Sequence, residues 1–431
     1  MTAGRRIIVV AWLVTSLFYF HQYAARSAPA VMMPQLSEVF GLSAAGLAAL
    51  LGLFYYGYAP FSLVAGVAMD ELGARTAVPI GAAAMGVGAL LFATGDPLLA
   101  GVGRFLQGAG GVFALIGAAY LATTNFPASR AATLIGATQM FGMAGGSAGQ
   151  FLVGPLIASG LAWNKFWLLM GAAGLLLSIM LFLLLPKRER LGATPLKAAQ
   201  PAKARSHWAK DAAIALGSVF RNPQSLLCGI IAGLMFVPTT IFGLVWGVRF
   251  IQEGFDLDFR MAVMRSAAVP FGWMIGCPLL GWVSDRIGRR KPVILGGAAV
   301  LLVTLFVIFY GPVTAFPPFV LGLIMGIASG ASMLTYTIIK EVNRPEYSGT
   351  ATGVVNFINF SFSALLGPVL GRLLTEASQG GERELGHYQV AFSPLLWGVG
   401  LAILLAVFLR ETGPKETSRK AAAVLSVGHS R

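Results

Sequence analysis

The chain has few charged residues and very few acidic ones for its length. Only 17 of its 431 residues are Asp or Glu, and charged residues make up 11% of the total. A soluble globular domain carries about 25% charged residues, so the composition argues against a soluble protein. The acidic residues all fall in predicted loops or at predicted helix ends. The sequence therefore offers no buried carboxylate relay of the kind that proton-coupled transporters commonly use.

Cysteine and histidine are scarce as well. Two cysteines, Cys228 and Cys277, and four histidines provide neither a disulfide framework nor a metal-ligand spacing. The sequence contains no G-x-x-x-x-G-K-[ST] phosphate-binding loop, and no nucleophile–base pair is visible in it. We therefore expect no ATP coupling, no enzymatic activity, no metal and no cofactor.

Long apolar runs are what the sequence has instead. Hydrophobic residues make up 56% of the chain. A run of about 20 apolar residues is long enough to cross a bilayer as a helix. Such runs occupy roughly residues 7–34, 44–66, 77–95, 98–122, 131–158, 164–185, 223–250, 260–284, 292–311, 316–339, 349–374 and 389–410. We predict an all-α polytopic membrane protein with 12 transmembrane helices.

The net charge is +14, and the distribution of the basic residues along the chain fits a membrane topology. If the N-terminus is cytoplasmic, most of the 31 Lys and Arg residues lie in cytoplasmic loops and tails. Cytoplasmic loops of membrane proteins carry such an excess, so we expect both termini in the cytoplasm and no nucleic-acid partner. Arg5 and Arg6 before an apolar run also fit a signal peptide, but the later spans favour a retained first helix. The expected location is an inner or plasma membrane.

A basic, polar stretch separates two groups of six apolar segments. Part of this linker, residues 207–220, is predicted to form a short interfacial helix. The predicted units are a bundle at 1–185, a cytoplasmic linker at 186–222, a second bundle at 223–411 and a cytoplasmic tail at 412–431.

The two groups repeat a loop motif. Residues 66–77, GVAMDELGARTA, and residues 281–292, GWVSDRIGRRKP, both fit G-x-x-x-D-x-x-G-x-R. Repeats at this scale are typical of transporters whose site lies between the halves. Asp70 and Asp285 could accept hydrogen bonds from a helix N-terminus or pair with Arg75 and Arg289. Alternatively, the charged residues of the turn only reflect the excess of basic residues in cytoplasmic loops.

These loops, together with GRFLQGAG at residues 103–110, make the chain resemble the major facilitator superfamily over nearly its whole length. The resemblance implies two pseudo-symmetric six-helix bundles that work by alternating access. It implies gating or conformational roles for Gly66, Asp70, Gly73, Arg75, Arg104, Gly108, Gly281, Asp285, Arg286, Gly288, Arg289 and Arg290. Arg104 is expected to pack against the first helix.

The first apolar segment carries an arginine on a polar stripe. Tyr19, Gln22, Tyr23 and Arg26 fall on one helical face at 100° per residue. A cation deep in a membrane helix costs roughly 2.5–3.5 kcal/mol on insertion scales, so such residues mark functional sites. The stripe predicts one wall of a polar cavity for an anion.

The same stripe resembles the first helix of organic-anion and organophosphate transporters in the superfamily, through Tyr19, Tyr23 and Arg26 followed by Met33 and Pro34. The resemblance implies that the arginine binds an anionic substrate and that the tyrosines line its cavity. The organophosphate branch has a second arginine in its seventh helix, where this chain has Thr240. A carboxylate, which needs one strong cation, is therefore favoured over a phosphate ester.

Further candidates are less tightly constrained by the sequence. Arg249 and Arg265 either contact the substrate or snorkel to the outer interface, where Glu253 could pair with them. From the remaining aromatic and amide side chains, which also form interfacial belts and helix contacts, we select Tyr56, Trp246 and Asn356 as cavity residues.

His21 is the candidate for proton coupling, because histidine titrates near neutral pH. It lies about 140° from Arg26 on the helical wheel, so it could instead hydrogen-bond to a neighbouring helix. Anion exchange, or a proton carried by the substrate, would need no protein carrier.

The leading hypothesis is a monomeric secondary transporter for a small organic anion. Its other partners are the lipid bilayer and a co-transported proton or counter-anion. The alternatives are a carrier of amino acids or other neutral or zwitterionic solutes, a multidrug effluxer, and a transporter-like sensor.

Overall fold

The computed structural model describes residues 3–126, 128–185, 208–344 and 347–413, and these ranges contain helices and connecting turns. The first half consists of α1 (Ala3–Ser27), η1 (Ala28–Val31), α2 (Met33–Phe40), α3 (Ala44–Glu71), α4 (Ala74–Phe92), α5 (Pro97–Asn125), α6 (Ala128–Phe151), α7 (Val153–Ala158) and α8 (Trp163–Leu184). The predicted first span, residues 7–34, is broken after Ser27, where Pro29 enters the first turn of η1.

The second half follows α9 (Trp208–Arg221), a helix in the predicted linker that confirms the expected helix at 207–220. Its elements are α10 (Pro223–Val237), the π-helical η4 (Pro238–Trp246), α11 (Gly247–Phe255), α12 (Phe259–Ile287), α13 (Lys291–Tyr310), η5 (Val313–Ala315), α14 (Val320–Ser329), η6 (Gly330–Met333), α15 (Leu334–Glu341), α16 (Ser348–Ala377) and α17 (Leu385–Ala406).

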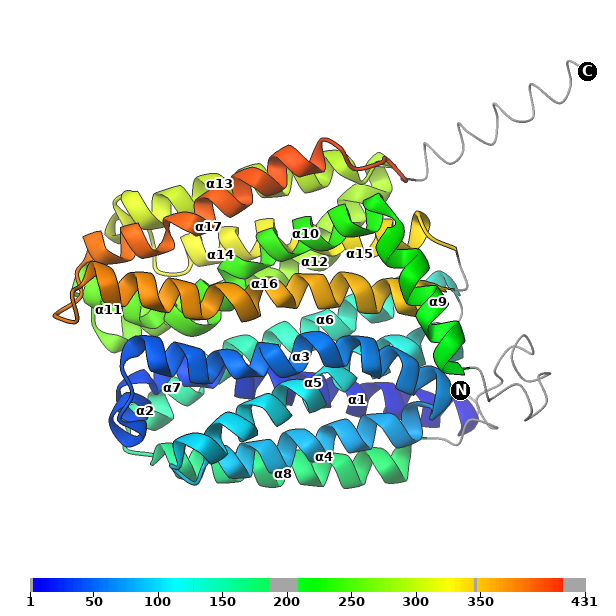
Figure 1. Cartoon of the computed structure of the whole chain (residues 1–431), viewed down its shortest axis with the longest axis horizontal. Coiled ribbons are helices and arrows are strands. Elements are labelled where there is room, and N and C mark those ends of the chain that lie inside the picture. The colour runs from blue at the N-terminus through cyan, green and yellow to red at the C-terminus, as the bar shows by residue number, and fades with distance from the viewer. Residues whose placement is uncertain (1–2, 127, 186–207, 345–346, 414–431) are drawn as a thin grey trace, which may run out of the picture.

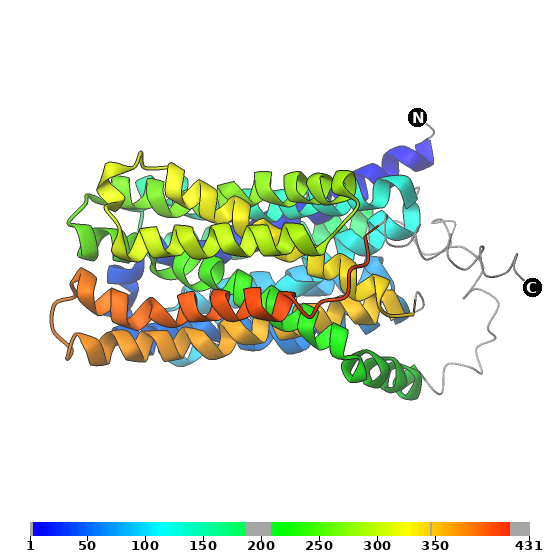
Figure 2. The ribbon, with the colours of Figure 1, turned by 90° about the horizontal axis from the view of Figure 1, so that it is seen from above.

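The long helices run side by side (Figures 1 and 2), and Figure 1 shows them in two groups. In Figure 1 the first half lies below the second, and α3 packs along α16 where the groups meet. A second pair, α6 and α12, joins the halves in the same way. We call the end where α1 begins and α17 ends the terminal end, and the opposite end, which carries α2 and α11, the distal end (Figure 1).

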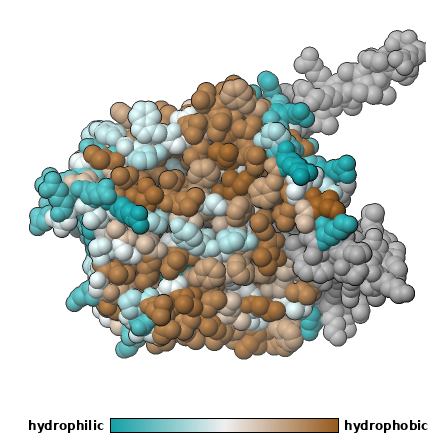
Figure 3. Space-filling model, viewed as in Figure 1, coloured by the Kyte–Doolittle hydropathy of each residue, from teal (hydrophilic) through white to brown (hydrophobic). Residues whose placement is uncertain are grey.

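The surface suits a bilayer. Hydrophobic residues cover the middle of the face in Figure 3, and hydrophilic residues gather toward its two ends. In the described part of the chain, 11 helices are long and apolar enough to cross a membrane. The remaining predicted segment, residues 131–158, is helical as α6 and α7 but is less apolar, because it contains Gln139, Ser147 and Gln150. The chain is therefore a multi-pass α-helical membrane protein.

Acidic residues at the distal end begin helices. The Asp96 side chain accepts a hydrogen bond of 2.8 Å from the Leu99 N–H at the start of α5. Asp258 accepts one of 2.7 Å from the Met261 N–H at the start of α12. A carboxylate at the N-cap satisfies a free N–H group and interacts favourably with the helix dipole. These aspartates therefore set helix boundaries rather than form a relay inside a span.

The repeated loops at the terminal end differ in part from the predicted contacts. Asp285 pairs with Arg290 at 2.6 Å, and the predicted partner Arg289 lies instead 3.8 Å from Glu411. Arg290 also pairs with Glu341 of α15 at 3.2 Å. Arg290 reaches both carboxylates from the turn, whereas Arg289 is largely exposed. The ion pair of this loop is therefore Asp285–Arg290, and the prediction of Arg289 was wrong.

In the first copy of the loop, Arg75 donates a 3.1 Å hydrogen bond to the Leu185 carbonyl and lies over the Phe182 ring at 5.4 Å. The Asp70 side chain, its predicted partner, lies outside the described part of the chain. Arg286, in the second copy, stacks on Trp282 at 5.4 Å.

The glycines of the two loops have different roles. Gly73 and Gly288 have φ angles of 75° and 72°, a region that favours glycine, so they make the turns possible. A Cβ atom built at Gly66 or Gly281 would meet no atom within 4 Å. These two glycines therefore do not bring helices into close contact in this conformation.

Glu411, just after the last helix, ties the chain end to this second loop. Its carboxylate accepts hydrogen bonds from the N–H groups of Arg290 at 2.7 Å and Lys291 at 3.2 Å, at the start of α13. Burial raises the pKa of the Glu411 carboxyl, but these and two further backbone N–H donors outweigh it, so the pKa lies below its ordinary value.

Replacing Glu411 by Gln is expected to reduce the free energy of unfolding by about 1 kcal/mol at neutral pH, because a helix cap loses its charge. The folded pKa is lowered, so the stabilisation is complete above the unfolded pKa near 4.5 and is lost as the pH falls below it. Thermal unfolding in detergent at pH 7 and pH 4 tests this. The Tm difference between wild type and Glu411→Gln should shrink at pH 4.

The exposed Glu376, at the distal end, provides the control. Glu376→Gln should leave Tm unchanged at both pH values. Equal Tm values for wild type and Glu411→Gln at pH 7 would contradict the capping role.

Candidate functional site

Arg26 lies at the boundary between the two halves, inside a cage of aromatic rings. Its side chain is 2% exposed. The guanidinium carbon lies 4.8 Å from the ring centroid of Tyr23 and 4.9 Å from that of Tyr55. Phe360, from the second half, is 4.8 Å away. The aromatic cage consists of Tyr23 from α1, Phe54, Tyr55 and Tyr58 from α3, Phe236 from α10 and Phe360 from α16. Ring faces attract a cation, so both halves stabilise this charge.

The hydrogen bonds of Arg26 leave its outer nitrogens unused. Nε donates to the Tyr55 hydroxyl at 3.3 Å, and that hydroxyl donates to the Thr240 carbonyl at 3.5 Å. Nη1 and Nη2 are buried without a hydrogen-bond partner. A buried charged donor without a partner is costly, and paired N–H groups of this kind suit a bidentate oxyanion. Arg26 thus has the chemistry of an anion-binding residue.

Two cavities lie on either side of the cage along the bundle axis. The distal cavity is lined by Arg26, Tyr55, Arg104, Trp246 and Ser363 among others. The terminal cavity lies toward the terminal end. Its polar lining consists of Tyr19, Tyr23, Gln139, Ser332, Tyr336, Asn356 and Asn359. None of the described residues that line either cavity is acidic.

The terminal cavity has a neutral, hydrogen-bonded lining. The Tyr336 hydroxyl donates to Asn356 Oδ1 at 2.9 Å and accepts from Asn359 Nδ2 at 3.0 Å. Tyr19 donates to Gln139 Oε1 at 3.2 Å. Asn356 Nδ2 and Asn359 Oδ1 are buried without partners, so one donor and one acceptor remain for a ligand. This surface can bind hydroxyl groups but supplies no charge.

Arg104 of α5 packs against α1, as expected, and also lines the distal cavity. Nη1 donates to Gln107 Oε1 at 2.7 Å and to the Ala25 carbonyl of α1 at 3.4 Å. A Cβ atom at Gly108, one turn further on, would lie 1.9 Å from the Phe54 carbonyl oxygen. Only glycine allows α5 to approach α3 this closely, and the approach brings Arg104 beside the cage.

The hydrogen bonds that join the two halves lie at the cage and on its distal side. Ser147 donates to the Ala267 carbonyl at 3.0 Å, and Gln150 Nε2 donates to the Gly243 carbonyl at 2.8 Å. Both Gly243 and Thr240, which accepts from Tyr55, belong to η4. A π-helical stretch often marks a functional site. The two halves are thus joined on the distal side of the cage in this conformation.

Several predicted residues do occupy the site. Tyr19, Tyr23, Arg26, Trp246 and Asn356 line one of the two cavities. Gln22 was placed wrongly, since its side chain packs against Gly111 of α5 and is not among the described residues lining either cavity. Tyr56 was also placed wrongly. It is 41% exposed, because one helical step of about 100° turns it away from its buried neighbour Tyr55.

His21 lies away from the cage. Its Nε2 atom is 2.9 Å from the Met170 carbonyl oxygen of α8, so the histidine packs inside the first half. This is the alternative of a hydrogen bond to a neighbouring helix. The proton-coupling role therefore has no support from the position of the ring.

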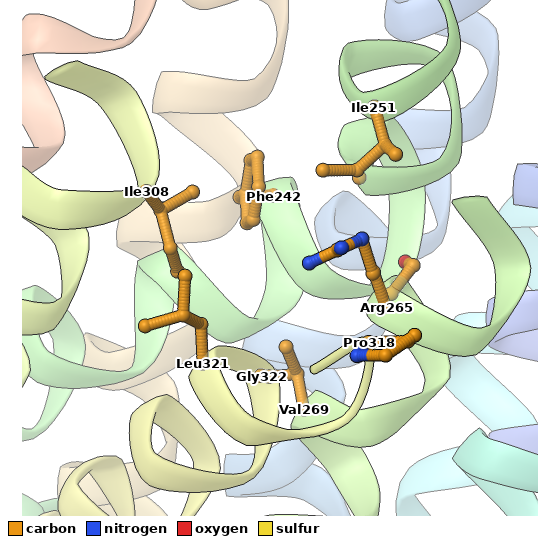
Figure 4. Close-up of a pocket in the computed structure, with 10 residues that line it drawn as sticks. Phe242, Ile251, Arg265, Val269, Ile308, Pro318, Leu321 and Gly322 are labelled. Carbon is orange, nitrogen blue, oxygen red and sulfur yellow. The ribbon is translucent and has the colours of Figure 1, made fainter. Parts of the chain in front are cut away.

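Arg249 and Arg265 also lie away from the cage. Arg249 pairs with Glu253, one turn later in α11, at 2.9 Å. Arg265 donates to the Phe316 carbonyl at 3.1 Å. Figure 4 shows its side chain extending into a separate cavity of the second half, near Phe242 and Leu321. Both side chains therefore lie outside the cage in this conformation, and Arg249 makes the alternative pairing with Glu253.

Some site residues carried no sequence signal. Phe54, Phe236 and Phe360 complete the cage, and Tyr336 organises the terminal cavity. The chain has 29 phenylalanines, and most of the described membrane spans contain two or more. Nothing in the spacing of these residues distinguishes the ones that face Arg26.

Known proteins resemble the chain over most of its length. The membrane sensor protein UhpC of Salmonella typhimurium is 26% identical over 96% of this chain and 93% of its own. The hexuronate transporter of Bacillus subtilis is 24% identical over 89% of this chain and 90% of its own. An MFS-type efflux pump of Mycolicibacterium smegmatis matches 60% of this chain at 26% identity.

Solved structures share the fold. A bacterial homologue of the human lysosomal transporter Spinster, inward-facing and unoccupied, aligns with a TM-score of 0.64 at 16% identity over 94% of this chain and 95% of that one. A point mutant of the nucleoside transporter NupG aligns with a TM-score of 0.66 at 14% identity over 93% of this chain and 99% of that one. The family model of the Major Facilitator Superfamily matches residues 15–368. The chain belongs to the major facilitator superfamily.

Proposed function

We propose that the chain is a secondary transporter of small organic anions and that Arg26 binds the anionic group. The observation that carries this proposal is the pair of Arg26 nitrogens, Nη1 and Nη2, buried without partners between the halves. A guanidinium that only joined helices would be expected to use these donors on protein oxygens. An oxyanion arriving from either side would supply both the missing hydrogen bonds and the missing charge.

The substrate that fits best is a hydroxylated carboxylate. Asn356, Asn359 and Tyr336 offer neutral donors and acceptors on the terminal side of the cage. The aromatic rings around them suit the C–H faces of a sugar-like body. A hexuronate is a sugar carboxylate, and the similarity to the hexuronate transporter of Bacillus subtilis supports the same class.

The position of the site supports alternating access. The cage takes Tyr55 from the first half and Phe360 from the second, so an anion bound at Arg26 contacts both. Ser147 and Gln150 join the halves on the distal side, and these bonds must break when that side opens. A ligand that binds one arrangement of the halves better shifts the equilibrium toward it. We propose that the terminal end faces the cytoplasm of an inner or plasma membrane.

The coupling that we propose needs no protein carboxylate. The described cavity residues include none, and His21 lies inside the first half. Exchange of one anion for another, or a proton carried by the substrate, satisfies both observations.

A sensor is the second candidate. Two proteins named membrane sensor protein UhpC, from Salmonella typhimurium and Escherichia coli, each match 96% of the chain, at 26% and 24% identity. A sensor of this fold would bind the anion at Arg26 without net flux. Uptake into proteoliposomes separates the two functions.

Replacing Arg26 by Gln should abolish uptake of glucuronate, gluconate or malate into proteoliposomes and weaken their binding at least about 30-fold. Loss of one partner of a buried charge pair costs about 2–5 kcal/mol, which corresponds to this range. Binding is measured by calorimetry or thermal shift. Flux is measured with radiolabelled anions. Arg249→Gln, which removes an arginine outside the cage, is the control and should retain both.

Unchanged anion binding in Arg26→Gln would overturn the proposed site. Normal Arg26-dependent binding without any uptake or exchange in the wild type would favour the sensor.

Replacing Gln150 by Ala should shift the population toward arrangements that are open at the distal end. The lost hydrogen bond contributes about 0.5–1.5 kcal/mol, so the shift is about two- to twelve-fold. A cysteine introduced at Ala48, which lines the distal cavity, reports opening by its rate of reaction with a water-soluble maleimide in a Cys277→Ser background.

Gln389→Ala is the matched control, because Gln389 Nε2 also donates to a backbone carbonyl at 2.8 Å but joins two helices of the same half. If both variants change the rate equally, the Gln150 bond does not control distal access.

A further inference from the structure

The distal cavity is lined by two buried arginines from different helices. We infer that Arg104 is a second anion-contacting residue and that, together with Arg26, it makes the site prefer dianionic over monoanionic carboxylates. This inference rests on the proposed function, because it assumes that Arg26 binds the substrate. It reassigns Arg104, which the sequence places among the gating residues, to the specificity of the site.

Both guanidinium groups flank one ring. The Arg26 carbon lies 5.4 Å from the Phe54 centroid and the Arg104 carbon 5.1 Å from the same centroid. Each side chain is 2% exposed, and both line the same cavity. Two cations therefore line one cavity.

The surroundings fix Arg104 in place and leave it with donors to spare. The hydrogen bonds described for it to Gln107 and Ala25 both use Nη1, and Nε is buried without a partner. Gln107 is itself held by its Nε2 atom, which donates to the Gly88 carbonyl of α4 at 3.0 Å. A guanidinium carries five N–H donors, so further donors remain for a ligand.

The charge of the cavity is not neutralised by the protein. None of the described residues lining the distal cavity is acidic, so the two like charges repel each other in surroundings of low dielectric constant. A bound monoanion balances one of them, whereas a dianion balances both. A dicarboxylate carries both charges on one molecule, so it can contact two guanidinium groups that line the same cavity.

The seventh predicted span has no arginine at the position of Thr240, and the second cation does not depend on one. At Thr240 the second half supplies a hydroxyl, which interacts with Ser363 Oγ at 2.7 Å. The second cation comes instead from α5, in the same half as Arg26. A single-cation site was the expectation from sequence, and the packing of α5 on α3 changes it.

The experiment compares anions that differ by one carboxylate on the same carbon skeleton. The pairs are malate with 3-hydroxybutyrate and glucarate with gluconate. Dissociation constants are measured by calorimetry at neutral pH on the full-length protein. Wild type should bind the dianion of at least one pair more tightly, by about tenfold or more, as expected for one added hydrogen bond between charged groups.

In Arg104→Gln this preference should fall to about twofold or less, because the second cation is gone. Arg104→Lys keeps the charge and should retain most of the preference. Arg265→Gln removes another buried arginine, outside the site, and should leave the ratio unchanged. The ratio of the two constants is the readout, since a purely structural arginine would weaken both anions equally.

The outcomes separate the two proposals. Binding of all four anions that depends on Arg26 but shows no dianion preference in the wild type overturns this inference and leaves the proposed function standing. An unchanged preference in Arg104→Gln, or an equal loss for both members of a pair, also overturns it. If the wild type binds none of the four anions, the proposed function fails and this inference fails with it. The wild-type ratio needs no variant, so it decides even where Arg104→Gln does not fold.

Discussion

The guanidinium of Arg26 lies where the two halves meet, surrounded by six aromatic rings and held by one hydrogen bond to Tyr55. None of the described residues in the adjoining cavities is acidic. Ring faces stabilise a cation only partly, since they provide no opposite charge. In the proposed function, a bound anion supplies the missing opposite charge, which links the fold to transport.

The hydrogen bonds that join the halves on the distal side of the cage are individually weak. On the distal side the halves share hydrogen bonds from Ser147 and Gln150 to backbone carbonyls, and one of these carbonyls belongs to the π-helical η4. Single hydrogen bonds contribute about 1 kcal/mol each, so a ligand can outweigh them. At the terminal end, the Asp285–Arg290 pair and Glu411 join elements of the second half to each other. These contacts therefore stay within one half, whereas the distal hydrogen bonds cross the boundary.

Parts of the site could be predicted because helical periodicity acts within one helix. Tyr19, Tyr23 and Arg26 repeat at three- and four-residue spacing, and all three line a cavity. Adjacent residues on a helix point in directions about 100° apart. Tyr55 therefore faces the cage, whereas Tyr56 points away from it and is exposed. Arg249 and Arg265 lie outside the cage, since their partners, Glu253 and the Phe316 carbonyl, belong to their own half. Helix periodicity contains no information about neighbouring helices.

The sequence alone determined the membrane class, the paired six-helix architecture and the polar stripe of α1. These follow from apolar run length, basic residues in loops and a repeated glycine–aspartate–arginine motif, which are local properties of the chain. Only the tertiary structure decided which phenylalanines enclose Arg26 and that Arg104 shares its cavity. That placement depends on Gly108, whose missing side chain lets α5 approach α3, and contacts between distant segments arise only when helices pack.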